Sequence, residues 1–477
     1  MGVVHNFDEG SRVAQVANVI RQRITGHALT PGAKLPSIRG FAQTMSVSTS
    51  TVVEAYDRLV SEGFIQPRRG SGFFVTRNPQ PLTLAQIGPR LDRAVDPFWV
   101  SRQSLEAGID MHKPGCGWLP ASWMPEAELR RALRNLSRAE PVRLADYATP
   151  LGHPSLRQIL SMRLGERGVV VPAEQIMLTD SGTQAIDMLC RLLIEPGDTV
   201  LVDDPCYFNF LALLRAHRVD IVGVPHTPDG PDLVRFQEAL RVHRPRLYIT
   251  NSAIHNPTGA RLSPVTAHRL LKHAEQAGLT IVEDDIFCDF EDQAAPRLSA
   301  FDGLERVIQI GSFSKTLTAA ARCGYIAARS EWIERLIDLK IATTFSGHQM
   351  SSEVVYAVLK DGSYRRHVTG LRDRLAGEME DVRRRLQEKG LVPWIDGNGG
   401  MFVWCALPDG LESADVARHA LEQGVVMAPG NVFSVSQSAG SFLRFNVAQC
   451  GDPRIFDILA RSMDACAVKK AEPAGRA

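Results

Sequence analysis

The chain has 477 residues, of which 44% are apolar and 22% are charged. This length predicts two or three domains, and the composition is that of a globular protein with a sizeable core, which excludes disorder along most of the chain. With 54 Lys and Arg against 53 Asp and Glu, the formal net charge is +1. The overall charge therefore indicates neither a strongly basic coat for nucleic acid nor an acidic tail.

The eight cysteines form no C-x-x-C pair, so we expect neither a disulfide framework nor a structural zinc site, and no metal is predicted. The N-terminus MGVVHNFDEG lacks the apolar core of a secretory signal. No stretch approaches the roughly 18 apolar residues that a membrane span needs. A cytoplasmic protein without a membrane partner is the expectation.

Residues 1–76 predict three short helices and a β-hairpin. Ser37 can cap the second helix, and either Ser46 or Ser48 can cap the third. The stretch FIQPRRGSGFFV alternates β-forming residues around a turn, which predicts a wing with Arg68 and Arg69 at its tip. The residues expected to face inward are Val13, Ala17, Ile20 and Ile24 on the first helix, and Val52, Tyr56, Leu59 and Val60 on the third.

Residues 77–110 are predicted to be an interdomain linker, because prolines at positions 79, 81, 89 and 97 prevent a long helix in its first half. Its later part, PFWVSRQSLEAG, carries enough apolar side chains to pack on another element. Over residues 111–477 short apolar runs alternate with helical patterns. That alternation predicts an α/β domain with a largely parallel sheet covered by helices on both faces.

The N-terminal module has the layout of a helix-turn-helix that reads the major groove of DNA. Its third helix opens with Ser48, Thr49, Ser50 and Thr51, whose hydroxyls can reach phosphates or base edges, and Arg39, Arg68 and Arg69 can pair with phosphates. Residues 1–76 carry eight Lys and Arg and five Asp and Glu, a net charge of +3 that leaves −2 for the rest of the chain. The alternative is a small helical domain whose serines only cap a helix.

The segment 29–75 resembles the winged helix-turn-helix of the GntR family of bacterial transcription regulators. It contains the elements L-P-S-x-R, V-S-x-x-T-V and L-x-x-E-G-[FY]-[IL]. The resemblance implies an operator in double-stranded DNA as a partner. Family members commonly place Arg directly after the Ser of V-S, where this chain has Thr49, so no operator sequence can be carried over.

Four short elements stand out in the α/β region. Lys315 lies in the Ser-rich loop GSFSKT, and SGTQ at 181–184 opens a helix whose N-terminus could hold a phosphate. HNPTG at 255–259 predicts a turn, and IVEDDIF at 281–287 predicts a buried strand that ends in acids. Taken singly, each has an ordinary interpretation: a surface lysine, a helix cap, a turn and a solvated strand end.

Read together and in this order, the four elements resemble the fold-type I aminotransferases, which bind pyridoxal 5′-phosphate, and the resemblance covers residues 111–477. It implies that Lys315 forms the Schiff base with the cofactor and that Asp284 keeps the pyridine nitrogen protonated. Asn256 and Tyr207 would contact the ring, and Arg444 would bind a ligand α-carboxylate, its alternative being a cross-strand ion pair. The phosphate would be held by Gly182, Thr183, Ser312, Ser314 and Arg322.

One position departs from the aminotransferase pattern. The family usually has Tyr where this chain has Phe287, and the missing hydroxyl would have donated to the cofactor ring. Cofactor binding is expected to persist, while efficient transamination is less favoured.

The two modules in this order resemble the MocR subfamily of regulators. The resemblance implies a homodimer that binds DNA and whose large domain senses pyridoxal 5′-phosphate, or an amino acid or amine compound, through Lys315. Two alternatives stay open: a working aminotransferase that carries a DNA-binding domain, and a regulator whose sensor has lost its cofactor.

Overall fold

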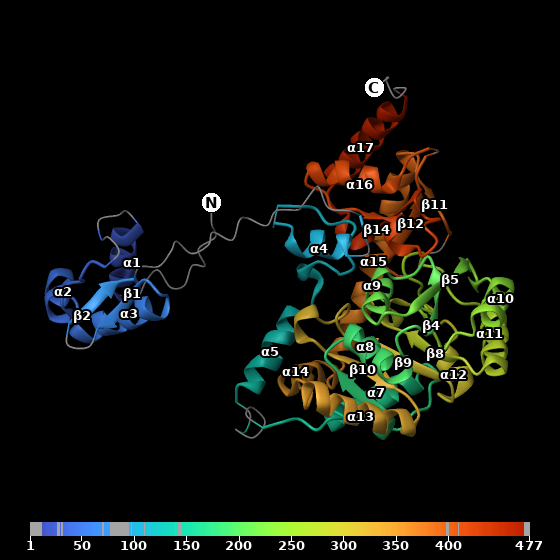
Figure 1. Ribbon diagram of the computed structural model, residues 1–477, viewed down its shortest axis with the longest axis horizontal. Coiled ribbons are helices and arrows are strands. Elements are labelled where there is room, and N and C mark those ends of the chain that lie inside the picture. The colour runs from blue at the N-terminus through green and yellow to red at the C-terminus, as the bar shows by residue number, and fades with distance from the viewer. Residues whose placement is uncertain are drawn as a thin grey trace. The chain divides into compact units, whose positions relative to one another are not determined.

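The computed structural model describes residues 12–25, 29, 32–68, 71–76, 95–96, 98–108, 110–138, 140, 146–396, 400–408 and 410–471. The chain divides into two compact units, Met1–Ile87 and Gly88–Ala477. The large unit contains an eight-stranded and a four-stranded sheet, and the small unit contains a two-stranded one (Figure 1). The boundaries 1–76, 77–110 and 111–477 stay a prediction.

The described part of the small unit consists of three helices and a hairpin, as the sequence predicts. Its elements are α1 (Arg12–Thr25), α2 (Ile38–Met45), α3 (Thr49–Ser61), β1 (Ile65–Arg68) and β2 (Gly72–Val75). The predicted inward residues Ala17, Tyr56 and Leu59 are buried in its core. Val16 and Ala55, which the apolar stripes omitted, are buried beside them.

The structure shows which of Ser46 and Ser48 caps the third helix of the small unit. Ser37 caps α2, because its hydroxyl accepts a hydrogen bond from Gly40 N at 3.2 Å. Ser48 caps α3 by accepting from Thr51 N at 3.1 Å. Ser46 ends α2 instead, with a φ of 52° in the left-handed region. Of the two serines proposed for the third helix, Ser48 is therefore the cap.

The predicted wing is the antiparallel pair β1–β2, in which Ile65 faces Val75 and Arg68 faces Gly72. The guanidinium of Arg68 lies 4.5 Å from the centre of the Phe74 ring, a cation–π contact that holds it on the wing. Arg69 lies outside the described residues.

The eight-stranded sheet of the large unit has the order β3-β10-β9-β8-β7-β4-β5-β6. Its five central strands, from β9 to β5, run parallel, while β10 is antiparallel to both its neighbours and β6 is antiparallel to β5. The strands are β3 (Ile176–Thr179), β4 (Thr199–Asp204), β5 (Asp220–Thr227), β6 (Gly230–Pro231), β7 (Leu247–Thr250), β8 (Thr280–Asp284), β9 (Val307–Ser312) and β10 (Gly324–Ala327).

Helices cover both faces of this sheet, as the alternating pattern predicts. Val200 and Val202 of β4 pack in a cluster with α8, α9 and α13, whereas Leu201 between them packs in a cluster with α10, α11 and α12. The α-helices described in the large unit are α4 (Trp99–Glu106), α5 (Glu126–Leu136), α7 (Pro154–Gly165), α8 (Gly182–Leu193), α9 (Phe208–Ala216), α10 (Leu233–His243), α11 (Pro264–Ala277), α12 (Leu298–Asp302), α13 (Ser330–Thr344), α14 (Gln349–Leu359), α15 (Ser363–Glu388), α16 (Ser413–Glu422) and α17 (Arg454–Ala471).

A second layer of the large unit is an antiparallel sheet of order β11-β12-β14-β13, which lies with α16 and α17 at the top of Figure 1. Its strands are β11 (Val392–Pro393), β12 (Phe402–Ala406), β13 (Ala428–Pro429) and β14 (Phe442–Asn446). Helix α4, from the segment predicted as a linker, buries Trp99 and Val100 in the core of this layer. The apolar part of that segment thus packs on the large unit.

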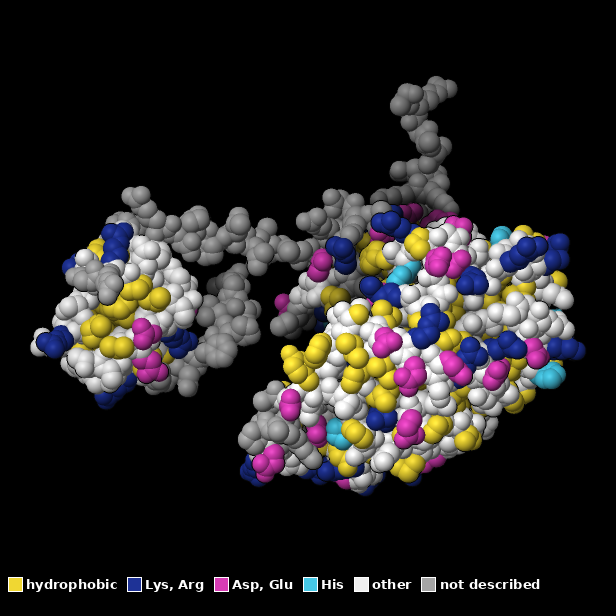
Figure 2. All heavy atoms as spheres, turned by 60° about the horizontal axis from the view of Figure 1, so that its bottom comes forward, with side chains coloured by type: hydrophobic (Ala, Val, Ile, Leu, Met, Phe, Trp, Pro, Cys, Tyr) yellow, Lys and Arg dark blue, Asp and Glu magenta, His cyan; other side chains and the backbone are white. Residues whose placement is uncertain are grey.

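No helix among the described residues combines the length and the apolar character that a membrane crossing needs. On the visible face of the large unit, basic and acidic side chains are interspersed (Figure 2). That face shows no extended patch of one sign, in keeping with the formal net charge of +1.

Candidate functional site

Lys315 lies in the loop after β9, inside the large unit. Its Nζ donates a hydrogen bond to the carbonyl oxygen of Gly117 at 2.6 Å. Burial, followed by the nearby charge of Arg444, lowers the pKa of Lys315 to about 8. Near neutral pH the amine is thus much closer to its neutral, nucleophilic form than a surface lysine is.

Asp284 ends β8 and faces the same site. Its Oδ1 accepts a hydrogen bond from Ile286 N at 3.1 Å, and its main-chain oxygen accepts one from Asn251 Nδ2 at 3.0 Å. Burial raises the pKa of Asp284 to about 7, although the positive charge of Lys315 acts in the opposite direction. A carboxylate in this setting is stabilised by a cationic partner, such as a protonated ring nitrogen.

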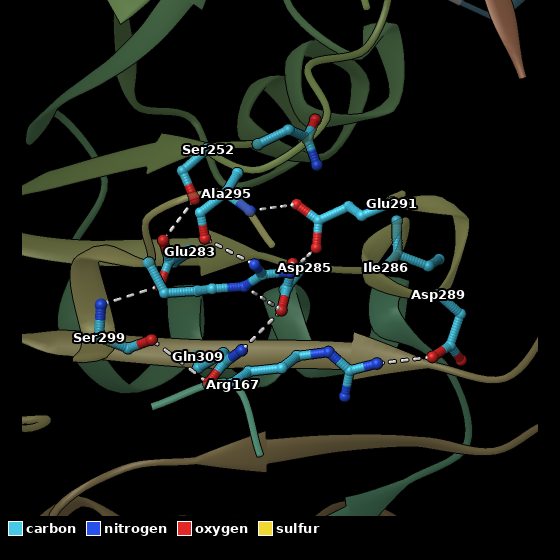
Figure 3. Close-up of polar contacts among 12 residues, drawn as sticks. Arg167, Ser252, Glu283, Asp285, Ile286, Asp289, Glu291, Ala295, Ser299 and Gln309 are labelled. Carbon is cyan, nitrogen blue, oxygen red and sulfur yellow. Dashed lines mark hydrogen bonds and ion pairs between the residues drawn. The ribbon is translucent and has the colours of Figure 1, made fainter. Parts of the chain in front are cut away.

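The alternation of β8 explains why Asp284, and not its neighbours, serves this site. Glu283 and Asp285 point to the other side of the strand, where Figure 3 shows them in a polar network of their own. Glu283 accepts hydrogen bonds from Leu298 N and Ser299 N at 2.7 and 2.9 Å. Asp285 pairs with Arg297 at 3.3 Å and accepts from Gln309 Nε2 at 2.9 Å. Arg297 also pairs with Glu291, so these acids are already partnered.

Arg444 lies on β14 and is 1% exposed. Its Nη1 donates to Asn256 Oδ1 and its Nη2 to the Gly115 carbonyl, both at 2.8 Å. Its Nε is buried, and no residue that the structure describes forms a hydrogen bond with it. The guanidinium lies 4.2 Å from the centre of the Phe402 ring and 4.8 Å from that of Phe433. Burial lowers the pKa of Arg444 to about 10, so it remains a cation at neutral pH. The alternative of a cross-strand ion pair is wrong, because its partners are an amide, a carbonyl and aromatic rings.

Residues predicted to hold a phosphate converge at the N-terminus of α8. A Cβ on Gly182 would lie 3.8 Å from the Cβ of Ser312. The Oγ of Ser312 lies 3.1 Å from that of Ser314 and donates to the main-chain oxygen of Cys323 at 3.0 Å, next to Arg322. A Cβ on Gly324 would collide with the main chain of Ser181 and Gly182. Glycine at position 324 therefore lets β10 pass close to the N-terminus of α8, the end of a helix that favours an anion.

Tyr207 and Asn256 join these groups from two further loops. Tyr207 precedes α9, and burial raises the pKa of its hydroxyl to about 12, with Arg444 and Asp284 as the charges that act on it. Asn256 contacts Arg444 as described. Thr183 lies on the first turn of α8, where its hydroxyl accepts from Asn209 Nδ2 at 3.5 Å. Phe287 is buried, and its ring centre lies 5.6 Å from that of Phe402.

In the small unit, the residues predicted to contact DNA lie at the start of α3 and on neighbouring elements. Ser48, Thr49 and Ser50 are exposed, and Thr51 is half-buried with its hydroxyl 2.8 Å from that of Ser48. Arg39 on α2 and Arg68 on the wing are also exposed. The fold thus leaves hydroxyls and guanidinium groups available to a partner on this unit.

The family comparison covers most of the large unit. Residues 121–461 match the family described as aminotransferase class I and II. The chain belongs to this family. Residues 12–75 match the bacterial regulatory proteins of the gntR family. This aminotransferase-family chain therefore carries a helix-turn-helix domain at its N-terminus, which confirms the predicted fold class and the MocR-type combination. Family membership also implies pyridoxal 5′-phosphate as the cofactor of the large unit.

Two curated relatives match this aminotransferase-family chain over both units. The HTH-type transcriptional regulator YdfD of Bacillus subtilis is 28% identical over 91% of this chain and 92% of its own length. The HTH-type transcriptional regulator NorG of Staphylococcus aureus is 26% identical over 85% of this chain and 94% of its own length.

Solved structures match the large unit. LysN, the α-aminoadipate aminotransferase of Thermus thermophilus complexed with N-(5′-phosphopyridoxyl)-L-leucine, is 26% identical, with a TM-score of 0.71 over 80% of this chain and 97% of its own. An archaeal alanine:glyoxylate aminotransferase is 27% identical, with a TM-score of 0.69 over 77% of this chain and 93% of its own.

The residues present fit the implied cofactor of this aminotransferase-family chain. A buried amine, a buried carboxyl with a raised pKa and a helix N-terminus with two nearby serines are present in the large unit. These are the donors and charges that an aldehyde, a pyridine nitrogen and a phosphate require.

Sequence reasoning missed several residues that the structure adds to this site. Gly115 and Gly117 supply carbonyls to Arg444 and Lys315, and Asn251 holds the end of β8. Asn446 donates to the carbonyls of Cys116 and Trp118 at 3.1 and 2.7 Å. A spacing of two residues from Arg444 places Asn446 on the same face of β14, which is the one signal that could have found it.

Among the residues that the structure describes, Asp203, His226 and His255 place their ligand atoms within 4.8 Å of one another, as a metal site would. The two imidazole rings are stacked, with centres 3.8 Å apart and planes inclined by 15°. Because the lone pairs of ring nitrogens lie in the ring planes, two nearly parallel rings do not converge on one ion. The absence of a metal stays a prediction.

Proposed function

We propose that this chain is a transcription regulator that depends on pyridoxal 5′-phosphate. Its small unit would bind an operator in double-stranded DNA, and its large unit would sense the cofactor or an amino acid or amine compound through Lys315. One observation carries the proposal: a gntR-family unit is joined to a large unit in which Lys315, Asp284 and Arg444 meet in a buried site. Relatives that match both units are named as transcriptional regulators.

Each residue of the large-unit site has a proposed task. When bound, the cofactor supplies an aldehyde that condenses with primary amines and a ring that withdraws electrons. Lys315 would supply the protein's amine, and Asp284 would hold a proton at the ring nitrogen. Tyr207 would stack on the ring, and Asn256 would donate to its oxygen. The phosphate would be held by Gly182, Thr183, Ser312, Ser314 and Arg322.

The small unit would place α3 in the major groove and the wing against the backbone. Ser48, Thr49 and Ser50 would contact phosphates or base edges, and Arg39, Arg68 and Arg69 would neutralise phosphates. We further propose a homodimer that binds two half-sites and acts in the cytoplasm, where operator DNA lies. A ligand would shift such a regulator only through a difference in its affinity for two conformations.

The cofactor proposal is tested by the absorbance of the purified full chain mixed with pyridoxal 5′-phosphate. We expect a visible band that Lys315→Ala abolishes, because the Lys315 amine is the proposed partner of the cofactor aldehyde. The control Lys272→Ala removes an exposed lysine of α11 and should leave the band unchanged. A band that survives Lys315→Ala would refute the proposed role of Lys315.

The DNA proposal is tested by binding to a promoter-proximal fragment at several salt concentrations. We expect affinity to fall steeply with salt and to drop when Arg68 and Arg69 are both changed to Ala, because each neutralised phosphate releases counterions. The matched control changes Arg235 and Arg241, two exposed arginines of α10, to Ala. Equal binding by the two double variants would contradict the assignment of the wing.

A working aminotransferase is the second candidate, because the same buried set of Lys315, Asp284 and Arg444 is what that chemistry needs. Against it stands Phe287, whose buried ring offers no hydroxyl to the site. Incubation with an amino acid and a keto acid separates the two candidates. Robust turnover would favour the enzyme and would contradict a purely regulatory role.

A further inference from the structure

Residues 112–118, which we call the strap, lie across the Lys315 and Arg444 site. The strap is anchored beside β13, since Gly115 N donates to the Val426 carbonyl and Val426 N donates to the His112 carbonyl, both at 2.9 Å. Along the chain it follows α4, and Lys113 Nζ donates to the Ala107 carbonyl at 3.2 Å. The strap is therefore tied to the segment that leads toward the small unit in the sequence.

Consecutive main-chain carbonyls of the strap accept hydrogen bonds from Asn446, Arg444 and Lys315. The main-chain N of Asn446 donates to the Pro114 carbonyl at 2.7 Å, and its Nδ2 donates to the carbonyls of Cys116 and Trp118 at 3.1 and 2.7 Å. Arg444 Nη2 donates to the Gly115 carbonyl at 2.8 Å, and Lys315 Nζ donates to the Gly117 carbonyl at 2.6 Å. The two cations proposed to bind a ligand thus also bind the main chain of the protein.

The guanidinium of Arg444 shows what would compete with this arrangement. Its Nε is buried and has no hydrogen-bond partner among the described residues, and its Nη2 donates to the Gly115 carbonyl. Nε and Nη2 share one edge of the planar group, so a carboxylate that binds this edge through two oxygens replaces the Gly115 carbonyl. Two hydrogen bonds from Arg444 to a carboxylate are stronger than its single hydrogen bond to the neutral Gly115 carbonyl, so a carboxylate displaces this carbonyl.

Two glycines allow the strap to come this close. A Cβ on Gly115 would overlap the main chain of Met427 and Ala428. On Gly117, a Cβ would lie 3.7 Å from Lys315 Nζ and 4.0 Å from Arg444 Nη2, which places this residue directly over the two cations. Any side chain at position 115 would push the strap away from β13.

We propose that the strap is an internal competitor that an amino carboxylate displaces. This inference rests on the proposed function and narrows its ligand to compounds that carry both an amine for the Lys315 position and a carboxylate for Arg444. An amine without a carboxylate leaves Gly115 on Arg444 and the strap in place. Release of the strap also frees the segment that follows α4, so ligand binding changes the main chain beyond the residues that contact the ligand.

The test uses the full chain loaded with pyridoxal 5′-phosphate and hydrogen exchange at the strap amides His112 and Gly115, which donate to Gly424 and Val426. The probes are the protein L-amino acids and β-alanine, each beside the amine that lacks its carboxylate, such as L-alanine beside ethylamine. We expect at least one amino carboxylate to speed exchange about tenfold while its amine does not. If none does, or if the amine acts equally, the proposal is wrong.

A variant separates competition from a merely structural role. Gly115→Ala should loosen the strap without ligand and lower the concentration of the active amino carboxylate needed for half-saturation about tenfold, because the competitor is weakened. The matched control is Gly108→Ala, where a Cβ meets nothing within 4 Å, and it should behave as the wild type. Unchanged or weaker ligand binding by Gly115→Ala overturns the proposal.

Two provisions keep the result decisive. If Gly115→Ala does not fold, Asn446→Ser, which removes the bonds to Cys116 and Trp118, is measured in the same way. Failure of the proposed function looks different, since the wild type would then show no absorbance band that depends on Lys315. With the band present and the strap unmoved, only the inference about the strap fails.

Discussion

The two units place their functional residues in opposite ways. The small unit presents four consecutive residues, Ser48 to Thr51, at the start of one helix, and three of them are exposed. The large unit gathers its site from loops and strands far apart in sequence, and the pair Gly115 and Arg444 is separated by 329 positions. One unit reads a partner with its surface, and the other builds a chemical environment in its interior.

The two units differ in how deeply their charged groups are buried. The pKa of Lys315 falls to about 8 and that of Asp284 rises to about 7, in both cases chiefly because the groups are buried. In the small unit, the ion pairs with Arg21 and Arg58 outweigh partial burial and lower the pKa of Glu62. Changes in the large unit should therefore alter chemistry and stability together. In the small unit, changes at Arg39, Thr49 and Ser50, the exposed residues of the reading face around the cap Ser48, should alter binding alone.

The largest expected effect is a loss of stability when the buried ion pairs of Arg297 are removed. Arg297→Ala leaves Asp285 and Glu291 without their cation, which should lower the free energy of unfolding of the large unit by about 3–5 kcal/mol. Urea unfolding followed by tryptophan fluorescence measures it, because all six tryptophans lie at position 99 or later. Arg235→Ala, which removes an exposed pair with Glu238, is the control and should change little.

A core change in the small unit tests whether the two units are energetically separate. Leu59 is fully buried, so Leu59→Ala should destabilise the small unit by about 3 kcal/mol through a cavity. DNA binding should fall while the cofactor band that depends on Lys315 persists. Simultaneous loss of both signals would show that the units fold as one.

The pH dependence of cofactor loading should report the burial of Lys315. Only the neutral amine attacks an aldehyde, so the loading rate should rise about tenfold per pH unit below 8 and level off above it. Absorbance after mixing with pyridoxal 5′-phosphate measures the rate. A rate that still climbs toward pH 10, as for an exposed lysine, would contradict the lowered pKa.

The smallest effect concerns the cap of α3. Ser48→Ala removes the bond to Thr51 N and should lower the free energy of unfolding of the small unit by about 1 kcal/mol. Ser48→Asp keeps a cap but places a negative charge on the reading face, so it should preserve stability and weaken DNA binding. If both variants bind DNA as the wild type does, Ser48 is a cap and not a contact.

Local chemistry made part of the fold predictable. The helices of the small unit, the cap Ser37 and the wing follow from apolar spacing and turn residues in the sequence, and the two-sided α/β sheet follows from its alternating elements. The choice of Ser48 over Ser46 did not follow, since both offer the same hydroxyl and only the left-handed φ of Ser46 separates them. Nor could spacing place α4 on the core, because its partners lie hundreds of residues away.

By itself, the sequence determined the two modules, the family and the residue types of the cofactor site, because motifs keep chemistry-bearing residues at fixed short spacings. Only the tertiary structure decided how they act. It turned Asp284 to one face of β8 and its neighbours to the other. It buried Lys315 and Arg444, which shifted their pKa values, and laid the strap over both. Burial and long-range contacts arise only when distant segments pack, so no local pattern encodes them.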